Sequence, residues 1–201
     1  MKNTNRVIKL LSPLITLVLL VYILFTCWAY LSCWNAASSL PSNIPQEFLR
    51  IKIYTTNEDT VSGTFSIIDS NGNEIAVIER SWGGSYLAVE FARVSIDGKY
   101  FIFPSRIYGK NRIIEERSER SHGTLLEKYY DDYGQCMLLG HGSTLKQRKL
   151  LYKIAAFATG KYKVPSFALV TNFSIDLSAC RPDKYYSITF NSDGSHLLEE
   201  L

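Results

Sequence analysis

The sequence predicts a mainly β protein of the α+β class: an N-terminal transmembrane helix followed by an antiparallel β domain, folded as a sandwich or an open barrel, with one amphipathic helix near residues 145–159. Three observations predict this class. From Leu10 to Trp34 the chain runs 25 residues without a charged side chain. Most later apolar residues alternate with polar ones, which is the period of a half-buried strand. One later stretch has the three-and-four spacing of an amphipathic helix.

The apolar run is long enough to cross a membrane. A helix rises about 1.5 Å per residue and the hydrocarbon layer is roughly 30 Å thick, so about twenty apolar residues span it. Ser12 and Pro13 supply a helix cap and a first helical residue, which predicts a helix from Pro13 to Trp34 of about 33 Å. Trp28, Tyr30 and Trp34 gather at its far end, where amphipathic rings favour the headgroup layer.

The charges around this run predict its orientation. Lys2, Arg6 and Lys9 precede it, and the first acidic residue of the chain is Glu47. The positive-inside rule therefore keeps the tail, residues 1–9, in the cytoplasm. We expect a single-pass membrane protein whose C-terminal domain is extracytoplasmic, which means periplasmic in a bacterium.

Three fates of the apolar run stay open. In the first, residues 10–34 form a retained signal-anchor. In the second, a peptidase cleaves near Ala36 and Ser38, although the apolar core of a signal peptide has only about 7–15 residues. In the third, Tyr30-Leu31-Ser32-Cys33 acts as a relaxed bacterial lipobox, and Cys33 carries the lipid.

Composition bounds the rest of the chain. Residues 35–46 are predicted to be a linker rich in Ser, Pro and Asn, and residues 47–201 one domain large enough for its own core. Three of the 22 Lys and Arg lie in the tail, which leaves 19 against 19 Asp and Glu. A formally neutral domain gives no support to nucleic-acid binding.

Alternation predicts a meander in the first half of the domain. Asn71-Gly72 predicts a tight hairpin between two of its strands, and Asp97-Gly98 predicts a second hairpin of the same kind. Pro104 is expected to limit how far the last strand pairs centrally. The predicted strands are Phe48–Thr55, Val61–Ile67, Glu74–Ile78, Tyr86–Ile96 and Lys99–Phe103.

The second half combines a charged segment, a helix and further strands. Residues 106–127 carry charges of both signs in mixed order and are predicted to form a solvated loop. Thr144 and Gln147 fit a capping box at the start of a helix over residues 145–159, and Gly160 followed by Pro165 ends it. The further strand predictions are Cys136–Leu139, Phe167–Leu177 and Tyr185–Phe190.

The two cysteines of the domain allow two interpretations. Cys136 and Cys180 can form a disulfide in an oxidising compartment, or they can remain two buried free thiols. Cys136 also lies five residues from His141, which suggests a thiol nucleophile with a base. No local signature of a cysteine hydrolase surrounds them, and a glycine-rich turn at Gly140-His141-Gly142 explains the same residues.

One group of lysines can contact an anionic surface. Lys146, Lys149 and Lys153 recur at helical spacing opposite the apolar stripe, so they can meet anionic lipid or an acidic protein of the envelope. A solvated helix surface is the plainer interpretation. No metal is predicted, because the three histidines lack the spacing of a helical or finger-type metal site. No catalytic residue or cofactor is predicted either.

Aromatic residues give the last local indications. Ser81-Trp82-Gly83-Gly84 between two strands can let a backbone or a ligand approach closely, with Trp82 as a recognition surface, although a plain turn also accounts for the glycines. Thirteen tyrosines and ten phenylalanines are numerous for this length. Aromatic rings favour both interfaces and strands, and packing within the sheets is the simpler prediction.

Four segments carry a resemblance: Ser42-Asn43-Ile44-Pro45, Ile78–Trp82, Phe103-Pro104-Ser105 and Tyr129–Asp132. With these segments the chain resembles an uncharacterised group of single-span membrane proteins of spirochaete bacteria, over most of its length. No activity or ligand is attached to that group, so the resemblance implies only a bacterial cell envelope.

Because the sequence combines a membrane anchor with no recognisable catalytic motif, it predicts a membrane-anchored, non-catalytic binding or interaction module of the envelope. One alternative is an envelope hydrolase or thiol enzyme that uses Cys136 and His141. Another is an accessory subunit of a membrane assembly.

Overall fold

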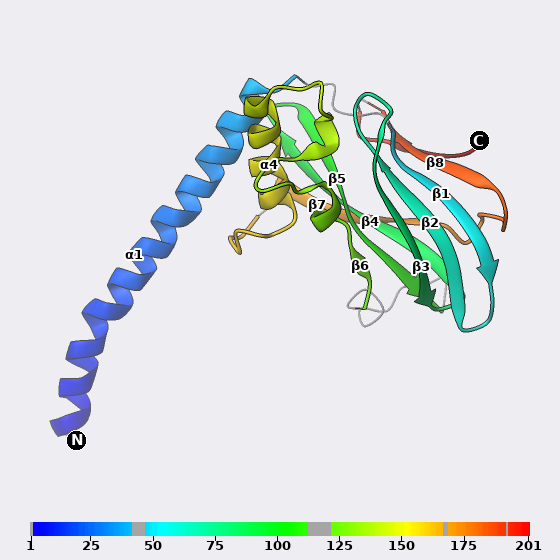
Figure 1. Ribbon diagram of the computed structural model, residues 1–201. Helices are drawn as coiled ribbons and strands as arrows, with labels where there is room; N and C mark the ends of the chain where they lie inside the picture. The colour runs from blue at the N-terminus through cyan, green and yellow to red at the C-terminus, as the bar shows by residue number, and fades with distance from the viewer. Residues whose placement is uncertain (1, 42–46, 112–121, 167–168, 192) are drawn as a thin grey trace.

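A long helix leads into a domain of two antiparallel sheets in the computed structural model, which describes residues 2–41, 47–111, 122–166, 169–191 and 193–201 (Figure 1). Sheet A has the strand order β3-β2-β1-β8-β9, and sheet B has the order β6-β5-β4-β7. The mainly β, α+β class is therefore confirmed. Of the two predicted architectures, the described strands form the two-sheet sandwich.

The bounds of the elements follow the chain. Sheet A contains β1 (Glu47–Thr56), β2 (Thr60–Ile68), β3 (Glu74–Gly83), β8 (Tyr185–Phe190) and β9 (His196–Glu200). Sheet B contains β4 (Tyr86–Ile96), β5 (Lys99–Lys110), β6 (Thr124–Leu125) and β7 (Val170–Asp176). The helices are α1 (Lys2–Ser39), α3 (Glu127–Tyr130), the 3₁₀ helix η1 (Met137–Leu139) and α4 (Leu145–Ala158).

Both predicted hairpins form, but their turns differ. Asp97 (φ 54°) and Gly98 (φ 70°) make a two-residue turn in which both residues have positive φ, as a type I′ hairpin requires. Between β2 and β3 the connection is longer than predicted and runs from Asp69 to Asn73. The Asp69 carboxylate accepts hydrogen bonds from the backbone N–H groups of Asn71 and Asn73, each at 2.8 Å, and so organises a wider loop.

The strand β5 is longer and more central than predicted. It runs through Pro104 to Lys110 and pairs with both β4 and β6, so residues 106–110 of the predicted solvated loop belong to a strand. Pro104 lies opposite Phe91, next to a bulge at Glu90 and Phe91. A bulge is a place where a sheet tolerates proline, because the ladder is already interrupted there. Residues 112–121 lie outside the described part of the chain.

The helix over residues 145–159 is confirmed as α4. The Thr144 side chain accepts from the Gln147 N–H, the Gln147 side chain accepts from the Thr144 N–H, and Gly160 follows with φ 73°. The strand predicted over residues 136–139 is wrong, because this segment forms a β bridge at Cys136 and then η1. The β2–β3 loop holds it there, since Ser70 donates to the carbonyls of residues 138 and 139.

The last strands follow the prediction in part. β8 has the predicted bounds, and β7 is shorter than the predicted strand 167–177, of which residues 167 and 168 lie outside the described part. β9 was not predicted, because its residues show no clear alternation.

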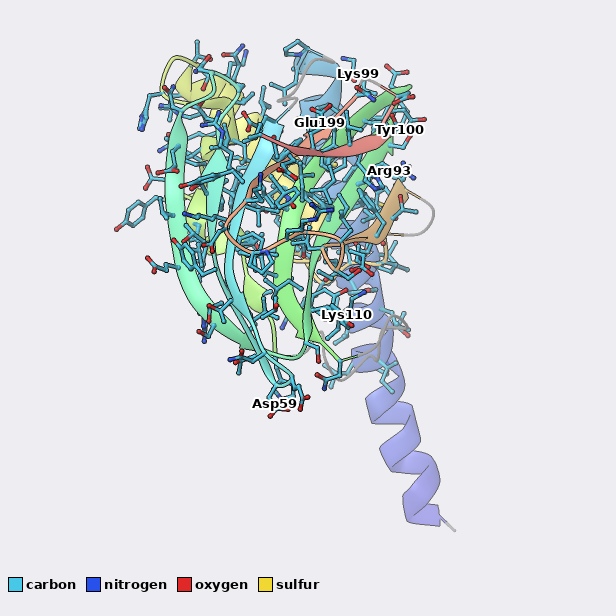
Figure 2. All side chains as sticks on the ribbon, turned by 90° about the vertical axis from the view of Figure 1, so that its right-hand side faces the viewer. Asp59, Arg93, Lys99, Tyr100, Lys110 and Glu199 are labelled. Atoms are coloured by element: carbon cyan, nitrogen blue, oxygen red, sulfur yellow. The ribbon has the colours of Figure 1, made fainter. Side chains whose placement is uncertain are left out.

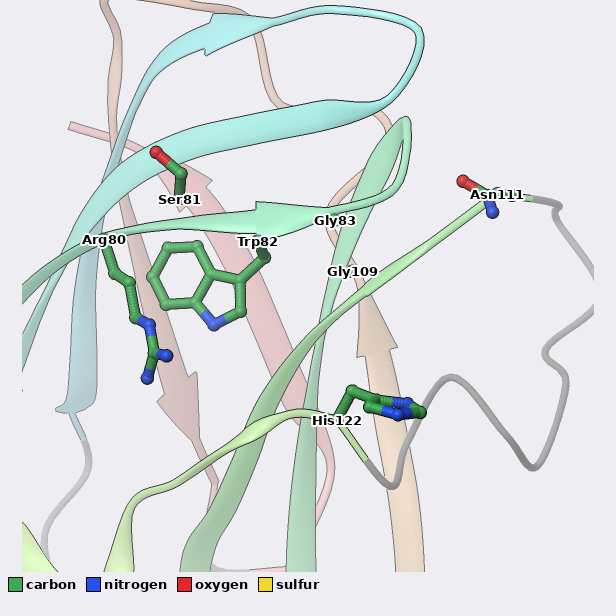
Figure 3. A pocket seen from close by; sticks show the side chains of 7 residues that line it. All are labelled: Arg80, Ser81, Trp82, Gly83, Gly109, Asn111 and His122. Atoms are coloured by element: carbon green, nitrogen blue, oxygen red, sulfur yellow. The ribbon is translucent and has the colours of Figure 1, made fainter.

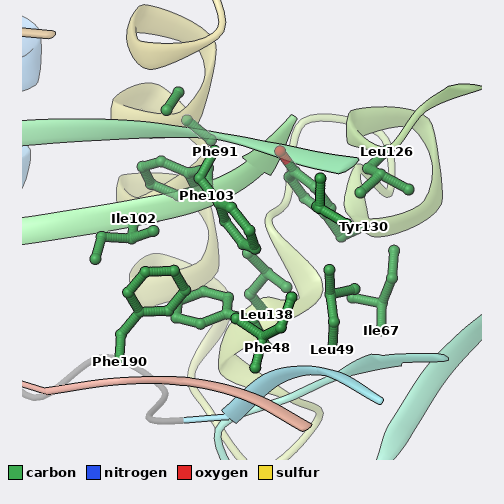
Figure 4. Packing of buried hydrophobic residues seen from close by; sticks show 14 of the residues in the cluster. Phe48, Leu49, Ile67, Phe91, Ile102, Phe103, Leu126, Tyr130, Leu138 and Phe190 are labelled. Atoms are coloured by element: carbon green, nitrogen blue, oxygen red, sulfur yellow. The ribbon is translucent and has the colours of Figure 1, made fainter. Parts of the chain in front are cut away.

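Aromatic side chains fill the space between the sheets. Phe91 on β4 meets Phe48 on β1 and Phe190 on β8, with ring centroids 6.4 and 4.9 Å apart (Figure 4). Such edge-to-face contacts are favourable beyond the area that they bury. The abundance of Phe is therefore explained by the core. On its other side sheet B is covered by α4, against which the end of α1 packs, so a helical layer adds to the two sheets (Figure 1).

The helix α1 is longer than predicted at both ends. It begins at Lys2 rather than Pro13 and continues to Ser39, through residues assigned above to the linker. Within it, Pro13–Ser39 is long and apolar enough to span a membrane. Ala36 and Ala37 are fully buried and belong to the hydrophobic core, so the anchor and the domain are joined by packed helix at this point.

Lys99 holds the C-terminal end of α1. Its Nζ atom, on the first residue of β5, donates to the carbonyl oxygens of Ala37 at 3.1 Å and Leu40 at 2.9 Å (Figure 2). Carbonyl groups at the end of a helix lack intrahelical partners and carry partial negative charge, so an ammonium group is stabilising there. The end of α1 is thus fixed to sheet B by the hydrogen bonds of Lys99 and to α4 by packing.

Candidate functional site

A pocket of about 370 Å³ lies where the ends of β3 and β5 meet, at one edge of the sandwich (Figure 3). Three parts of the chain build it: the end of β3, the end of β5, and His122 just before β6. Its lining residues are Arg80, Ser81, Trp82, Gly83, Gly109, Asn111 and His122.

Two glycines bring the sheets together here. A Cβ atom added to Gly109 would lie only 1.9 Å from the carbonyl oxygen of Gly83, so the two backbones touch across the edge of the sandwich. Gly84 then turns the chain with φ 125°. The segment that begins at Ser81 therefore serves both as a turn and as a point of close backbone approach, as the glycines predicted.

Trp82 forms the fixed wall of the pocket. The side chain is only 5% exposed, its ring packs edge-on against Phe65 at 5.3 Å, and its Nε1–H donates to the Thr124 hydroxyl at 3.0 Å. It is a buried, anchored residue and not the exposed recognition surface that we considered above. Ser81 points to the opposite face of the strand, where its hydroxyl is bonded to Ser62.

Arg80 supplies the charge of the pocket. It lies two residues from Trp82, hence on the same face of β3, and its Nη1 donates to the same Thr124 oxygen at 3.2 Å. The guanidinium group has five N–H donors in a planar fork, which suits carboxylate or phosphate oxygens. His122 and Asn111 add polar groups to the lining. No acidic side chain is among the described residues that line the pocket.

The side chains that line this pocket can recognise a ligand through charge, hydrogen bonds and stacking. The lining offers a cation, an imidazole and an amide beside an indole ring. The one side-chain hydroxyl among these residues, that of Ser81, points away from the pocket and is hydrogen-bonded to Ser62. The described residues hold no group of three His, Cys, Asp or Glu side chains suited to a metal ion.

Cys136 and Cys180 are both free and buried in this structure, which corresponds to the second of the two interpretations above. Burial raises the pKa of Cys136 to about 12 and that of Cys180 to about 11. His141 is exposed in the turn before α4, whereas Cys136 is fully buried. The structure therefore does not present Cys136 and His141 as an accessible pair.

The lysines singled out on α4 are accessible to different degrees. Lys146 and Lys149 are exposed, and Lys153 is half-buried. α4 stands beside α1 rather than lying across its end (Figure 1). Contact of these three lysines with an acidic partner or with anionic lipid stays a prediction.

Sequence reasoning missed four members of the pocket, namely Arg80, Gly109, Asn111 and His122. Arg80 could have been found, because a cation two positions from a tryptophan on a strand shares its face. Asn111 and His122 carried no such signal, since they flank strands of sheet B and reach Trp82 of sheet A only where the two sheets meet.

The fold and the site define a two-sheet β domain joined to a helix that is long and apolar enough to span a membrane. No family of proteins, no curated protein and no solved structure matches the chain.

Proposed function

We propose that this protein is a non-catalytic binding module of the cell envelope, held to the membrane by α1, and that the pocket at Trp82 binds an anionic group. Carboxylate and phosphate are both anions whose oxygen atoms accept hydrogen bonds from a guanidinium group. One observation carries the proposal: Arg80 and Trp82 both donate to the hydroxyl of Thr124, which fixes a cation against an apolar wall at an open edge of the fold.

This arrangement favours binding because little remains to be ordered. Trp82 and Thr124 are buried, so the wall keeps its shape without a ligand. The conformational cost of binding is then limited mainly to the exposed end of Arg80. A preorganised cation beside an apolar surface suits a ligand that combines a carboxylate or phosphate with a flat, weakly polar body, such as an acidic sugar.

The orientation is part of the proposal. The three basic residues of the N-terminal tail support a cytoplasmic N-terminus and a domain on the far side of the membrane. The resemblance to spirochaete membrane proteins supports a bacterial envelope. In that location the ligand would be an acidic polymer, a lipid headgroup or an acidic envelope protein, and nucleic acid would be absent.

Ligand binding is tested by calorimetry on the full chain in detergent, with inorganic phosphate, acetate and glucuronate as separate probes. Arg80→Gln removes the charge and keeps a polar side chain. Arg181→Gln, an exposed arginine outside the pocket, is the matched control. We expect R80Q to weaken binding about tenfold, since a hydrogen bond to a charged group contributes about 1.5 kcal/mol. Equal affinities in the two variants, or no binding of any probe, would refute the assignment.

Protease accessibility in intact spheroplasts tests the orientation independently. Digestion of the domain from outside, with a full-length band in untreated carbonate-washed membranes, is the expected result. Protection of the domain would place it in the cytoplasm.

Thiol labelling tests the enzyme alternative. A pKa of about 12 leaves on the order of one part in 10⁴ of Cys136 as thiolate at pH 8, and the side chain is fully buried. We expect no labelling of Cys136 by a maleimide in the folded protein and complete labelling in denaturant. Rapid labelling in the folded state would restore the thiol-enzyme hypothesis.

A further inference from the structure

The free part of α1 has nearly the length of the hydrocarbon layer. From Leu14 to Leu24 every large apolar residue is exposed, and beyond Leu24 the first fully buried residue is Ala29. The apolar segment from Leu10 to Trp28 has a length of about 28 Å, against roughly 30 Å of hydrocarbon. If α1 crosses the membrane, the headgroup layer on the side of the domain therefore lies near Trp28, at the level where the domain begins.

The loop that follows α4 lies at this level. The Tyr162 ring stands edge-on to the Trp28 ring with centroids 6.0 Å apart, and the Tyr30 hydroxyl donates to the carbonyl of Pro165 at 2.7 Å. Two aromatic residues of the helix thus hold the loop from Lys161 to Pro165 beside the point at which α1 leaves the membrane.

A second loop is tied to the first through Lys161. Its Nζ donates to the Asp131 carboxylate at 2.8 Å and lies 3.4 Å from the Glu127 carboxylate. The other oxygen of Asp131 accepts from the Gly134 N–H at 3.0 Å, which closes the turn over residues 131–134. The turn over residues 131–134 is thus tied through Lys161 to the loop that contacts α1.

Each loop presents an exposed residue in an unfavourable backbone conformation. Tyr133 is 99% exposed at φ 46°, and Lys163 is exposed at φ 51°. The other described non-glycine residues with positive φ are two aspartates, a residue type that tolerates it. A tyrosine ring that projects fully into water buries no area against the domain, so packing within the domain does not explain its backbone conformation.

We propose that Trp28, Tyr133, Tyr162 and Lys163 form a membrane collar that rests in the phospholipid headgroup layer on the domain side of the bilayer. Tyrosine and tryptophan prefer that layer because one end of the ring system is apolar and the other polar, and lysine attracts anionic headgroups. The collar continues the surface of the spanning helix. The inference depends on α1 crossing the membrane and is independent of the ligand of the Trp82 pocket.

The test places a fluorophore on the collar of the full chain. A Cys27→Ser background removes the one exposed native thiol. Tyr133→Cys carries the label, and Tyr185→Cys, a tyrosine 52% exposed on β8 of sheet A, is the matched control. Each variant is reconstituted in nanodiscs of phosphatidylcholine and phosphatidylglycerol that contain a lipid with a nitroxide on its headgroup.

We expect the nitroxide to quench the label at position 133 several-fold more than the label at position 185. Equal quenching at the two positions would overturn the collar. Extraction of the protein from membranes by carbonate would also overturn the collar, because α1 would then not cross the membrane. Ligand binding by the pocket would be unaffected in either case.

A second variant separates lipid contact from structure. Lys163→Gly relieves the positive φ, so we expect an unchanged or higher melting temperature in detergent. In anionic nanodiscs the same change should reduce the quenching at position 133, because a cation of the collar is lost. Quenching that stays unchanged, or falls only together with the melting temperature, would assign Lys163 a structural role instead.

Discussion

The two halves of α1 meet different surroundings with different residues. Between Leu14 and Leu24 the helix exposes large aliphatic side chains around its whole circumference. Its last turns bury small residues against the domain, namely Ala29, Cys33, Ala36 and Ala37, each at most 2% exposed. Small side chains at three-and-four spacing let another helix approach closely, whereas large ones cover the backbone toward lipid. Residue size, and not hydrophobicity, separates the exposed half of α1 from the packing half.

The comparison is tested most strongly by truncation. Removal of residues 1–28 deletes only the exposed half, so we expect the remaining chain to fold with nearly the stability of the full protein. Removal of residues 1–40 uncovers the side of α4 that α1 buries and deletes the carbonyl groups bound by Lys99. We expect this to cost roughly 3–6 kcal/mol of unfolding free energy, measured by urea denaturation in the same detergent. Equal stabilities of the two truncations would show that the packed half of α1 is dispensable.

A single enlarged residue tests the same contrast more finely. Ala37→Leu forces a larger side chain into a fully buried position, and we expect it to destabilise the domain by about 1–3 kcal/mol. Val18→Leu is the matched control, since Val18 is 61% exposed on the free half, and its effect should stay below about 0.5 kcal/mol. Urea denaturation monitored by tryptophan fluorescence measures both. A larger loss from V18L than from A37L would contradict the division of the helix.

The sequence could not reveal where this division falls. A run of apolar residues satisfies lipid and protein equally, so periodicity predicted one uninterrupted span that ended at Trp34. The regular alternation in β1 and β8 and the capping box of α4 depend on neighbours in sequence, and these elements were predicted nearly to their ends. The path of β5 through Pro104 was missed, because it depends on a bulge in the pairing of β4 with β5, at which β5 carries one extra residue.

The candidate pocket shows the same limit. Arg80 and Trp82 share a face of β3 by simple alternation, which is visible in the sequence. Thr124, which receives hydrogen bonds from both, lies more than forty residues further along the chain and comes near them only through the contact between the sheets. Local patterns can therefore predict half of such a site, and the other half is a property of the topology.

Lys99 tests the electrostatic part of the junction. Lys99→Met keeps most of the aliphatic stem but loses two hydrogen bonds to the carbonyl groups at the end of α1. We expect a loss of about 1–2 kcal/mol in unfolding free energy. Lys146→Met, at an exposed position of α4, should change stability by less than about 0.5 kcal/mol. Equal effects would mean that the loss reflects total charge rather than the capping of α1.

The smallest expected effect concerns one hydroxyl group. Tyr30→Phe removes the hydrogen bond to the Pro165 carbonyl and keeps the edge-to-face contact with Phe157, whose ring centroid lies 5.1 Å away. We expect a loss of about 0.5–1.5 kcal/mol, the usual net value of one hydrogen bond. Tyr22→Phe is the same substitution on the free half, where the ring is 45% exposed, and it should leave the domain unaffected. Because Tyr30 holds the loop from Lys161 to Pro165, amide hydrogen exchange in that loop should also rise in Y30F and not in Y22F. Unchanged exchange in Y30F would mean that Tyr162 and Lys161 alone hold the loop beside the helix.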